Sequence, residues 1–321
     1  MPCNEREWRT VESLNDTEHR LNRSKRRTRG NDSAMDMISY PSTNELTQGT
    51  IFTCAASEDY FVAAPRGLVI TARCDVAHSK TPVISYVPLI SFRAWLFCDG
   101  LRLVALRVLA MSRGAMRSAL RDAGLAESMI DTLSAEILRE QLESMTEKAE
   151  RNAAKRYADA KAQKDAAEAA LAAAPAEKHA ADLFDAQAKE YQRMLQELLS
   201  NSIADYHFVE RSEPGEDCEG YVALLREIRY LPVALASELV NGIDFQRFAE
   251  LCRDQPRYSD KLTVSDAEQY AMPVGLLQSP FIELFMQRFT SLYARIGVTD
   301  FSPNLMSTLR GIVPFNFGDA E

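Results

Sequence analysis

Residues 148–177 read KAERNAAKRYADAKAQKDAAEAALAAAPAE, an alanine-rich and highly charged run with one proline at position 175. Alanine, lysine, arginine and glutamate favour helix, whereas proline interrupts it. Apolar residues recur at steps of three and four on both sides of the proline, over 138–149 and again over 184–198. This heptad-like spacing predicts two amphipathic helices that pair as an antiparallel coiled coil. We therefore expect a long helical hairpin over residues 138–202.

Segments typical of short β-strands lie on both sides of this run. Leu68–Asp75 is rich in β-branched residues and bounded by turn residues, and Val83–Val87 and Tyr221–Ile228 have a similar composition. A long excursion costs little closure entropy when its two ends lie close together. The sequence therefore predicts an α+β fold: a small β-barrel-like body with packed helices, formed discontinuously by residues 46–137 and 203–321, with the hairpin inserted.

Further helices are expected around these strands. Apolar residues recur at helical spacing in four segments, namely Phe92–Asp122, Val233–Val240, Phe245–Cys252 and Pro280–Ile296. Ser134 precedes the next apolar period and is expected to cap a helix there. Lys261–Pro273 instead predicts a last pair of strands.

Residues 1–45 are polar and show no sustained hydrophobic period. Six basic residues cluster between Arg20 and Arg29. This composition predicts a disordered basic tail. The alternatives are a nuclear-import signal, a phosphate-binding patch, or a native start at Met35 or Met37, just before the globular pattern begins.

The composition excludes several classes of protein. The chain has 321 residues, of which 46% are hydrophobic, and a formal net charge of −9, which argues against a general nucleic-acid binder. Six cysteines without a CxxC pair suit a reducing cytosol. No run of 18 apolar residues is free of charge, so we expect neither a membrane span nor a secretory signal. The sequence therefore predicts a cytoplasmic protein that does not contact a membrane.

The densest group of reactive side chains is Cys74, Asp75, His78 and Lys80, at the end of a predicted strand. A thiolate forms near neutral pH when a cation lies beside it, and His78 or Lys80 could supply that charge for catalysis. Cys54, Cys74 and His78 could alternatively begin a zinc site, although no fourth ligand is identified. In a purely structural interpretation, Cys74 packs inward and Asp75 caps the turn. No Walker, GxGxxG, HExxH or GxSxG motif occurs, and we expect no cofactor and no metal.

A second group consists of arginines in the predicted helix over 92–122. Asp99 is the only acid between Phe92 and Arg121. These arginines are candidates for binding phosphates or an acidic partner, or else they pair with the protein's own carboxylates. They are Arg102, Arg107, Arg113, Arg117 and Arg121.

The opening Gln48–Phe52, the turn Arg66-Gly67 and the strand Leu68–Thr71 resemble the start of the MazF/PemK-type SH3-like barrels. In that family an arginine near this strand and a later serine or threonine assist RNA cleavage. The resemblance implies that Arg66 has the role of the arginine. The hydroxyl partner cannot be placed by position.

A larger part of the chain, residues 47–298, resembles a group of uncharacterised bacterial proteins associated with phage defence and mobile islands. The resemblance implies a bacterial cytosolic protein and carries no established activity. The matching segments are Gln48–Ile51, Cys74-Asp75, Ser279-Pro280, Gln287–Phe289 and Arg295–Gly297.

These observations lead to three hypotheses about function. The first is a non-catalytic adaptor or sensor subunit of a bacterial, possibly defence-related, multi-protein system that uses the 138–202 hairpin to bind a partner protein or itself. The second is a nucleic-acid-binding protein or MazF-like endoribonuclease acting through the barrel face. The third is a metal or redox site at Cys74.

Overall fold

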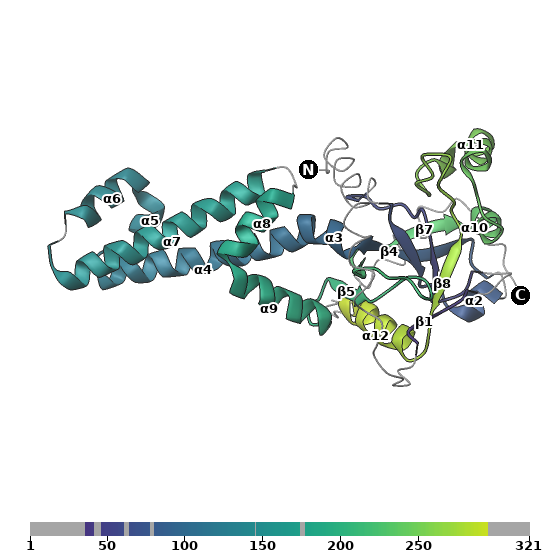
Figure 1. Cartoon of the computed structure of the whole chain (residues 1–321), viewed down its shortest axis with the longest axis horizontal. Helices are drawn as coiled ribbons and strands as arrows, with labels where there is room; N and C mark the ends of the chain where they lie inside the picture. Colours follow the sequence, from purple (N-terminus) through teal and green to yellow (C-terminus); the bar gives the residue numbers. More distant parts are fainter. Residues whose placement is uncertain are drawn as a thin grey trace, which may run out of the picture.

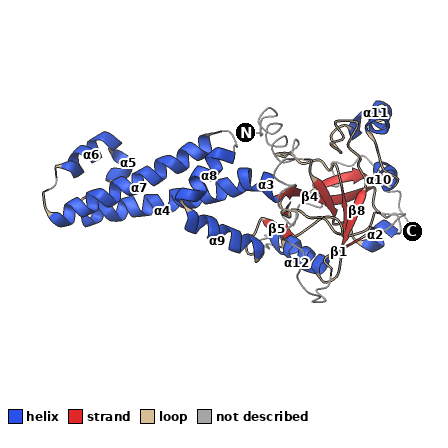
Figure 2. Cartoon of the chain, in the orientation of Figure 1, coloured by secondary structure: helices blue, strands red, loops and turns tan. Residues whose placement is uncertain are grey.

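The computed structural model describes residues 36–41, 46–60, 64–77, 80–144, 146–173 and 177–294. These residues form a mixed α+β protein that is 52% helical. A helical arm extends from one side of a body that contains the described strands (Figures 1 and 2). None of the helices in these ranges is long and apolar enough to cross a membrane.

The body is built on one curled, antiparallel sheet that forms a half-barrel. Strands from before and after the helical arm share this sheet. The spatial order is β1 (Ile38–Ser39), β8 (Pro273–Leu277), β2 (Thr50–Phe52), β3 (Arg66–Val69), β4 (Val83–Ser91), β6 (Tyr221–Leu224) and β5 (Tyr206–Val209), and β7 (Arg229–Pro232) also pairs with β4.

Helices cover both faces of the sheet. Side chains alternate between the faces of a strand, so Leu68 and Val69 of β3 face opposite sides. Leu68 is buried in a cluster with Phe285 of α12 (Phe281–Tyr293). Val69 is buried in another cluster with residues from α10 (Val233–Val240) and α11 (Phe245–Asp254). A 3-10 turn at Pro256–Tyr258 follows α11.

The arm begins where β4 continues directly into helix. Ser91 caps α3 (Phe92–Trp95) by accepting a hydrogen bond from the backbone of Ala94. A π-helical turn, Leu96–Gly100, joins α3 to α4 (Leu101–Asp122). The arm therefore leaves the sheet without an intervening loop (Figure 1).

The chain turns at the far end of the arm and comes back along α4. The turn contains α5 (Met129–Thr132) and α6 (Ala135–Glu143), with Ser134 as the predicted N-cap of α6. A capping box formed by Glu147 and Glu150 begins α7 (Lys148–Ala172). The last two helices of the arm, α8 (Glu177–Ala186) and α9 (Ala188–Leu199), lead back to β5.

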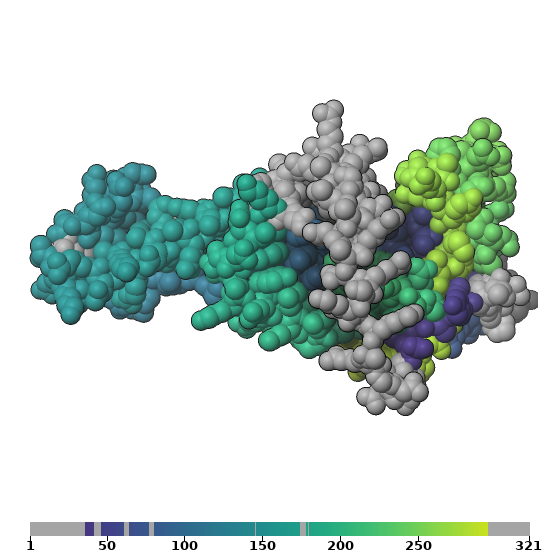
Figure 3. Space-filling view, in the orientation of Figure 1, coloured from purple at the N-terminus to yellow at the C-terminus, as the bar shows by residue number. Residues whose placement is uncertain are grey.

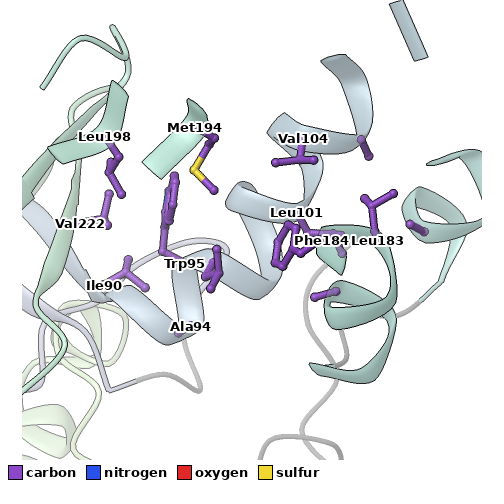
Figure 4. Close-up of a cluster of buried hydrophobic side chains, with 14 of the residues drawn as sticks. Ile90, Ala94, Trp95, Leu101, Val104, Leu183, Phe184, Met194, Leu198 and Val222 are labelled. Carbon is purple, nitrogen blue, oxygen red and sulfur yellow. The ribbon is translucent and has the colours of Figure 1, made fainter. Parts of the chain in front are cut away.

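A buried cluster around Trp95, here called the root cluster, fixes the arm to the sheet. Trp95 is fully buried, and α4, α8, α9 and two strands all contribute apolar side chains to the same cluster (Figure 4). The residues labelled in Figure 4 are Ile90, Ala94, Trp95, Leu101, Val104, Leu183, Phe184, Met194, Leu198 and Val222, and the cluster also includes Val108 of α4 and Ala167 of α7.

A second buried cluster, here called the tip cluster, holds the outer half of the arm together. It joins Met116 and Leu120 of α4 to Tyr157 of α7, and it contains no residue of the sheet. Its buried members are Met116, Ala119, Leu120, Ala123, Leu138, Leu142, Ala153, Tyr157 and Ala160. The outer arm is therefore stabilised by its own helices and stands clear of the body (Figure 3).

The predicted pairing of helices within 138–202 differs from the structure, and a long hairpin or coiled coil of those residues is not shown. Instead, α7 packs mainly along α4, which the sequence assigned to the body. The buried seam of α7 is mostly alanine, as at Ala153 and Ala160, and α4 offers it the larger side chains of Met116 and Leu120. Heptad-like spacing shows that a helix has an apolar seam but does not identify the helix that covers it.

Three expected strand segments also differ. The strand predicted for Leu68–Asp75 ends at Val69, and a short helix α2 (Arg73–Ala77) follows. Tyr221–Ile228 ends as a strand at Leu224, before a turn into β7. Lys261–Pro273 contributes isolated bridges at Leu262 and Ala271 and the first residue of β8, which is the last strand among the described residues. Composition indicated β-structure in each region without fixing where the chain turns.

Candidate functional site

A buried polar cluster lies around Arg66, the first residue of β3. The guanidinium donates a hydrogen bond from Nη1 to the Ser212 hydroxyl. Its Nη2 lies 3.1 Å from Oε1 of Glu216 and 3.6 Å from Oε1 of Glu213. Only 17% of the Arg66 side chain and 12% of the Glu216 side chain are exposed, so this ion pair is largely shielded from solvent.

The Glu216 carboxylate receives hydrogen bonds on both oxygens. Oε2 accepts from the backbone nitrogen and the hydroxyl of Ser212, each at 2.8 Å, and Oε1 accepts from the Tyr221 hydroxyl at 2.6 Å. Burial acts to raise the pKa of Glu216. The hydrogen bonds from Tyr221 and Ser212 and the charge of Arg66 outweigh that effect and lower the pKa below its ordinary value.

Strands β3, β6 and β8 position this cluster. Arg66 lies on β3 and Tyr221 on β6, with β4 between them, and the guanidinium lies 4.9 Å from the centre of the Tyr221 ring. Ser212, in the loop between β5 and β6, is fully buried. Its carbonyl oxygen lies directly over Gly275 of β8, where a Cβ atom would approach that oxygen to 2.1 Å. Glycine at this position is what allows the loop to lie on the sheet.

The predicted group at Cys74 lies in and just after α2. Cys74 is exposed, and its thiol lies 3.6 Å from Oδ1 of Asp75 as a hydrogen-bond donor. Lys80 is exposed, and its backbone nitrogen donates to the carbonyl of Asp75 at 3.0 Å. His78 lies outside the described residues.

Cys54 does not join this group. It is buried in the cluster beneath α10 and α11, and burial raises its pKa to about 11. A neutral, buried thiol of this kind behaves as a small apolar side chain. Within the described ranges, no three His, Cys, Asp or Glu side chains are grouped closely enough to hold a metal ion.

The arginines of α4 are mostly engaged with carboxylates of the protein itself. Arg107 pairs with Glu197 of α9, and two others pair with residues in the turn at the end of the arm: Arg117 with Asp131 and Arg121 with Glu127. Arg102 is exposed, and its positive charge acts to lower the pKa of Asp99. Arg113 is exposed and makes no ion pair with any residue that the structure describes. The arginines therefore do not form one free cationic face.

A further group of polar residues, around Asp99 in the π-helical turn, was not predicted as a site. Burial raises the pKa of Asp99, although the hydroxyls of Tyr60 and Tyr206 and the charge of Arg102 act in the opposite direction. The Tyr60 hydroxyl is itself buried and has no hydrogen bond of ordinary geometry within the described residues. The available sequence signal was that Asp99 is the only acid in the arginine-rich segment from Phe92 to Arg121.

Comparison with known proteins adds no further assignment. No protein-family model matches the chain, nor does any curated protein or solved structure. A function for this chain must therefore be inferred from its own geometry.

Proposed function

We propose that this chain is a non-catalytic interaction protein, an adaptor or sensor subunit of a bacterial multi-protein system, that binds its partner through the helical arm. The tip cluster carries this proposal. Its residues come only from the arm, so the outer helices form a packed unit without contributing to the core of the sheet. A structured extension of this kind is suited to reaching another molecule.

The surface of the arm supports the same role. Leu106 and Met111 of α4 are 47% and 46% exposed, and Ile137 of α6 is 51% exposed. Arg113 follows Leu106 by two helical turns, so the two side chains lie on one face of α4. An exposed leucine and an exposed arginine on one face offer both apolar contact and charge to an acidic, amphipathic segment of a partner protein or of a second copy.

A truncation provides one test. Residues 111–163 would be replaced by a short Gly/Ser link, which removes the tip cluster. Val108 and Ala167 belong to the root cluster and remain, about 8–10 Å apart as expected for packed helices. Affinity purification from native cells should recover a stoichiometric partner with the full chain and lose it with the truncated chain.

A surface variant keeps the arm intact and locates the contact. Leu106→Glu with Arg113→Glu should weaken binding of the same partner at least about 10-fold, because both side chains are exposed and neither contributes to a buried cluster. A photo-crosslinker at position 113 should capture the partner, and one at Asp254 of α11 should not. Sedimentation of the purified chain distinguishes a second copy from another protein. Unchanged recovery with both variants would contradict the proposal.

A second candidate function, nucleic-acid binding or MazF-like RNA cleavage through the sheet, is favoured by one contact. The Ser212 hydroxyl lies against Arg66, so an arginine and a hydroxyl occur together on the half-barrel. The carboxylates of Glu213 and Glu216 beside the same guanidinium oppose a role in binding phosphate. Salt-dependent binding or cleavage of labelled RNA that is lost in Arg66→Gln would support this function, and no RNA retention at low salt would rule it out.

A further inference from the structure

The carboxylate of Glu216 is surrounded by hydrogen-bond donors in the way that a bound ligand would be. Oε1 accepts a hydrogen bond from the Tyr221 hydroxyl and forms an ion pair with Nη2 of Arg66, and Oε2 accepts hydrogen bonds from the Ser212 backbone nitrogen and hydroxyl. Three hydrogen bonds and one guanidinium, distributed over both oxygens, are a set of partners suited to a carboxylate. Charge-assisted hydrogen bonds of this kind are about twice as strong as neutral ones.

Each of these donors also has contacts with the sheet that do not involve Glu216. Arg66 and Tyr221 are strand residues, and the guanidinium packs on the tyrosine ring. Ser212 is fixed separately, because its carbonyl oxygen lies against Gly275 of β8. The Ser212 hydroxyl also accepts a hydrogen bond from Arg66 and is thereby oriented toward the carboxylate. Removal of Glu216 would therefore leave the donors close to their present positions.

Glu216 itself is attached through a surface turn. It follows Pro214 and Gly215, and Gly215 has a positive φ of 75° with no atom within 4 Å of the position of a Cβ. The three residues that follow Glu216 are exposed. Rotation about the glycine can therefore move Glu216 outward without moving Ser212 or breaking the pairing of β5 with β6.

We propose that Arg66, Ser212 and Tyr221 form a binding site for a carboxylate ligand, and that Glu216 occupies this site as an exchangeable internal competitor. The ligand is either a small free carboxylate or a carboxylate presented by an acidic peptide. This site belongs to the body, so its existence does not depend on the function proposed for the arm. Because a ligand binds only when Glu216 has left, its apparent affinity equals the affinity of the open site multiplied by the fraction of molecules in which the site is open.

The first experiment removes the competitor. In Glu216→Ala, acetate, succinate and a tetraglutamate peptide should each shift the backbone amide resonance of Ser212, at sodium chloride concentrations adjusted to constant ionic strength. Apparent affinity should be at least about 10-fold weaker in the wild type, because Glu216 must leave first. Adding Tyr221→Phe to Glu216→Ala keeps the ring against Arg66 but removes one donor, and should weaken binding several-fold.

Glu213→Ala is the matched control, because Glu213 lies 3.6 Å from the same guanidinium and receives none of the other hydrogen bonds of the site. It should not increase carboxylate binding. Succinate binding without peptide binding would identify the ligand as a small molecule, and peptide binding would identify a protein segment, and either supports the proposal.

The second experiment tests exchange in the wild type. Saturating succinate or peptide should accelerate hydrogen exchange of the amides of residues 215–219 and leave β3 and β6 protected. Three results would each overturn the proposal: a folded Glu216→Ala variant that binds no carboxylate, a response to inorganic phosphate alone, or a wild-type loop whose exchange does not change. In each of these cases Glu216 would only fasten the loop to the sheet.

Discussion

Gly275→Ala is the substitution that most directly tests how the β5–β6 loop lies on the sheet. The added Cβ would lie 2.1 Å from the carbonyl oxygen of Ser212, 3.1 Å from its carbonyl carbon and 3.0 Å from Cγ2 of Ile38. The nearest of these atoms belongs to the backbone and cannot rotate away as the end of a side chain would. The loop must therefore move, and Ser212 must move with it.

The size of the effect depends on that distance. Ordinary contact begins near 3.4 Å, so the carbonyl oxygen and the new Cβ must separate by about 1.3 Å (3.4 minus 2.1). Overpacking of a tight contact typically costs about 1–3 kcal/mol. A shift of this size also lengthens the two hydrogen bonds from Ser212 to Glu216, and bonds to a charged group contribute about 1.5–3 kcal/mol. We expect Gly275→Ala to lower the free energy of unfolding by about 2–4 kcal/mol.

Chemical denaturation measures the global effect, and hydrogen exchange of residues 211–220 measures any local release of the loop. The control is Gly114→Ala in α4, where no atom lies within 4 Å of the new Cβ. That change should stabilise the protein by about 0.5–1 kcal/mol, because alanine favours helix over glycine. If Gly275→Ala changed stability by less than about 0.5 kcal/mol and left exchange in the loop unaltered, the contact with Gly275 would not be what holds Ser212 in place.

Three further predictions concern the arm and the two buried carboxylates. Leu120→Ala should lower the free energy of unfolding by about 2–5 kcal/mol. Hydrogen exchange should become faster for amides of the tip cluster in this variant, whereas Leu89→Ala should make it faster for amides of the sheet. The folded-state pKa of Glu216 is lowered from its ordinary value of 4.5, so the ionised carboxylate stabilises the protein above pH 4.5. This stabilisation is lost as pH falls through the folded-state pKa. In chemical denaturation, the difference in unfolding free energy between wild type and Glu216→Gln should therefore shrink as the pH is lowered. Because the folded-state pKa of Asp99 is raised, its ionised form destabilises the protein as pH rises through that pKa. Asp99→Asn should therefore raise the melting temperature at neutral pH but not at acidic pH.

Local patterns predicted the helices of the body closely. The expected Val233–Val240 matches α10, and the expected Phe245–Cys252 and Pro280–Ile296 overlap α11 and α12. Each helix buries one apolar face against the sheet, and that face produces a helical period in the sequence. The partner of α7 had no such local signal, because it depends on contacts between segments that lie far apart in the chain.

The candidate site was predictable only in part. Arg66 stood out through a resemblance, but Ser212 and Glu216 lie about 150 residues later in the chain, in a segment that reads as an ordinary acidic turn. The contact that joins them depends on Gly275, in a third segment. Three distant segments meet through sheet pairing, and a single sequence shows each segment without showing the register that joins them.

The junction between arm and sheet bears on how the arm would act. A flexible tether usually connects through glycine- or serine-rich loops, which leave the direction of the attached segment free. Here β4 continues into α3 and α4 without a loop, and Trp95 is fully buried between that helix, α9 and the sheet. Bending at this point would expose the root cluster, and burial of each large side chain in it contributes about 1.5–3 kcal/mol. The arm therefore holds one direction relative to the half-barrel. A partner bound to the face of α4 that carries Leu106 and Arg113 would be held at a fixed position relative to the Arg66 site.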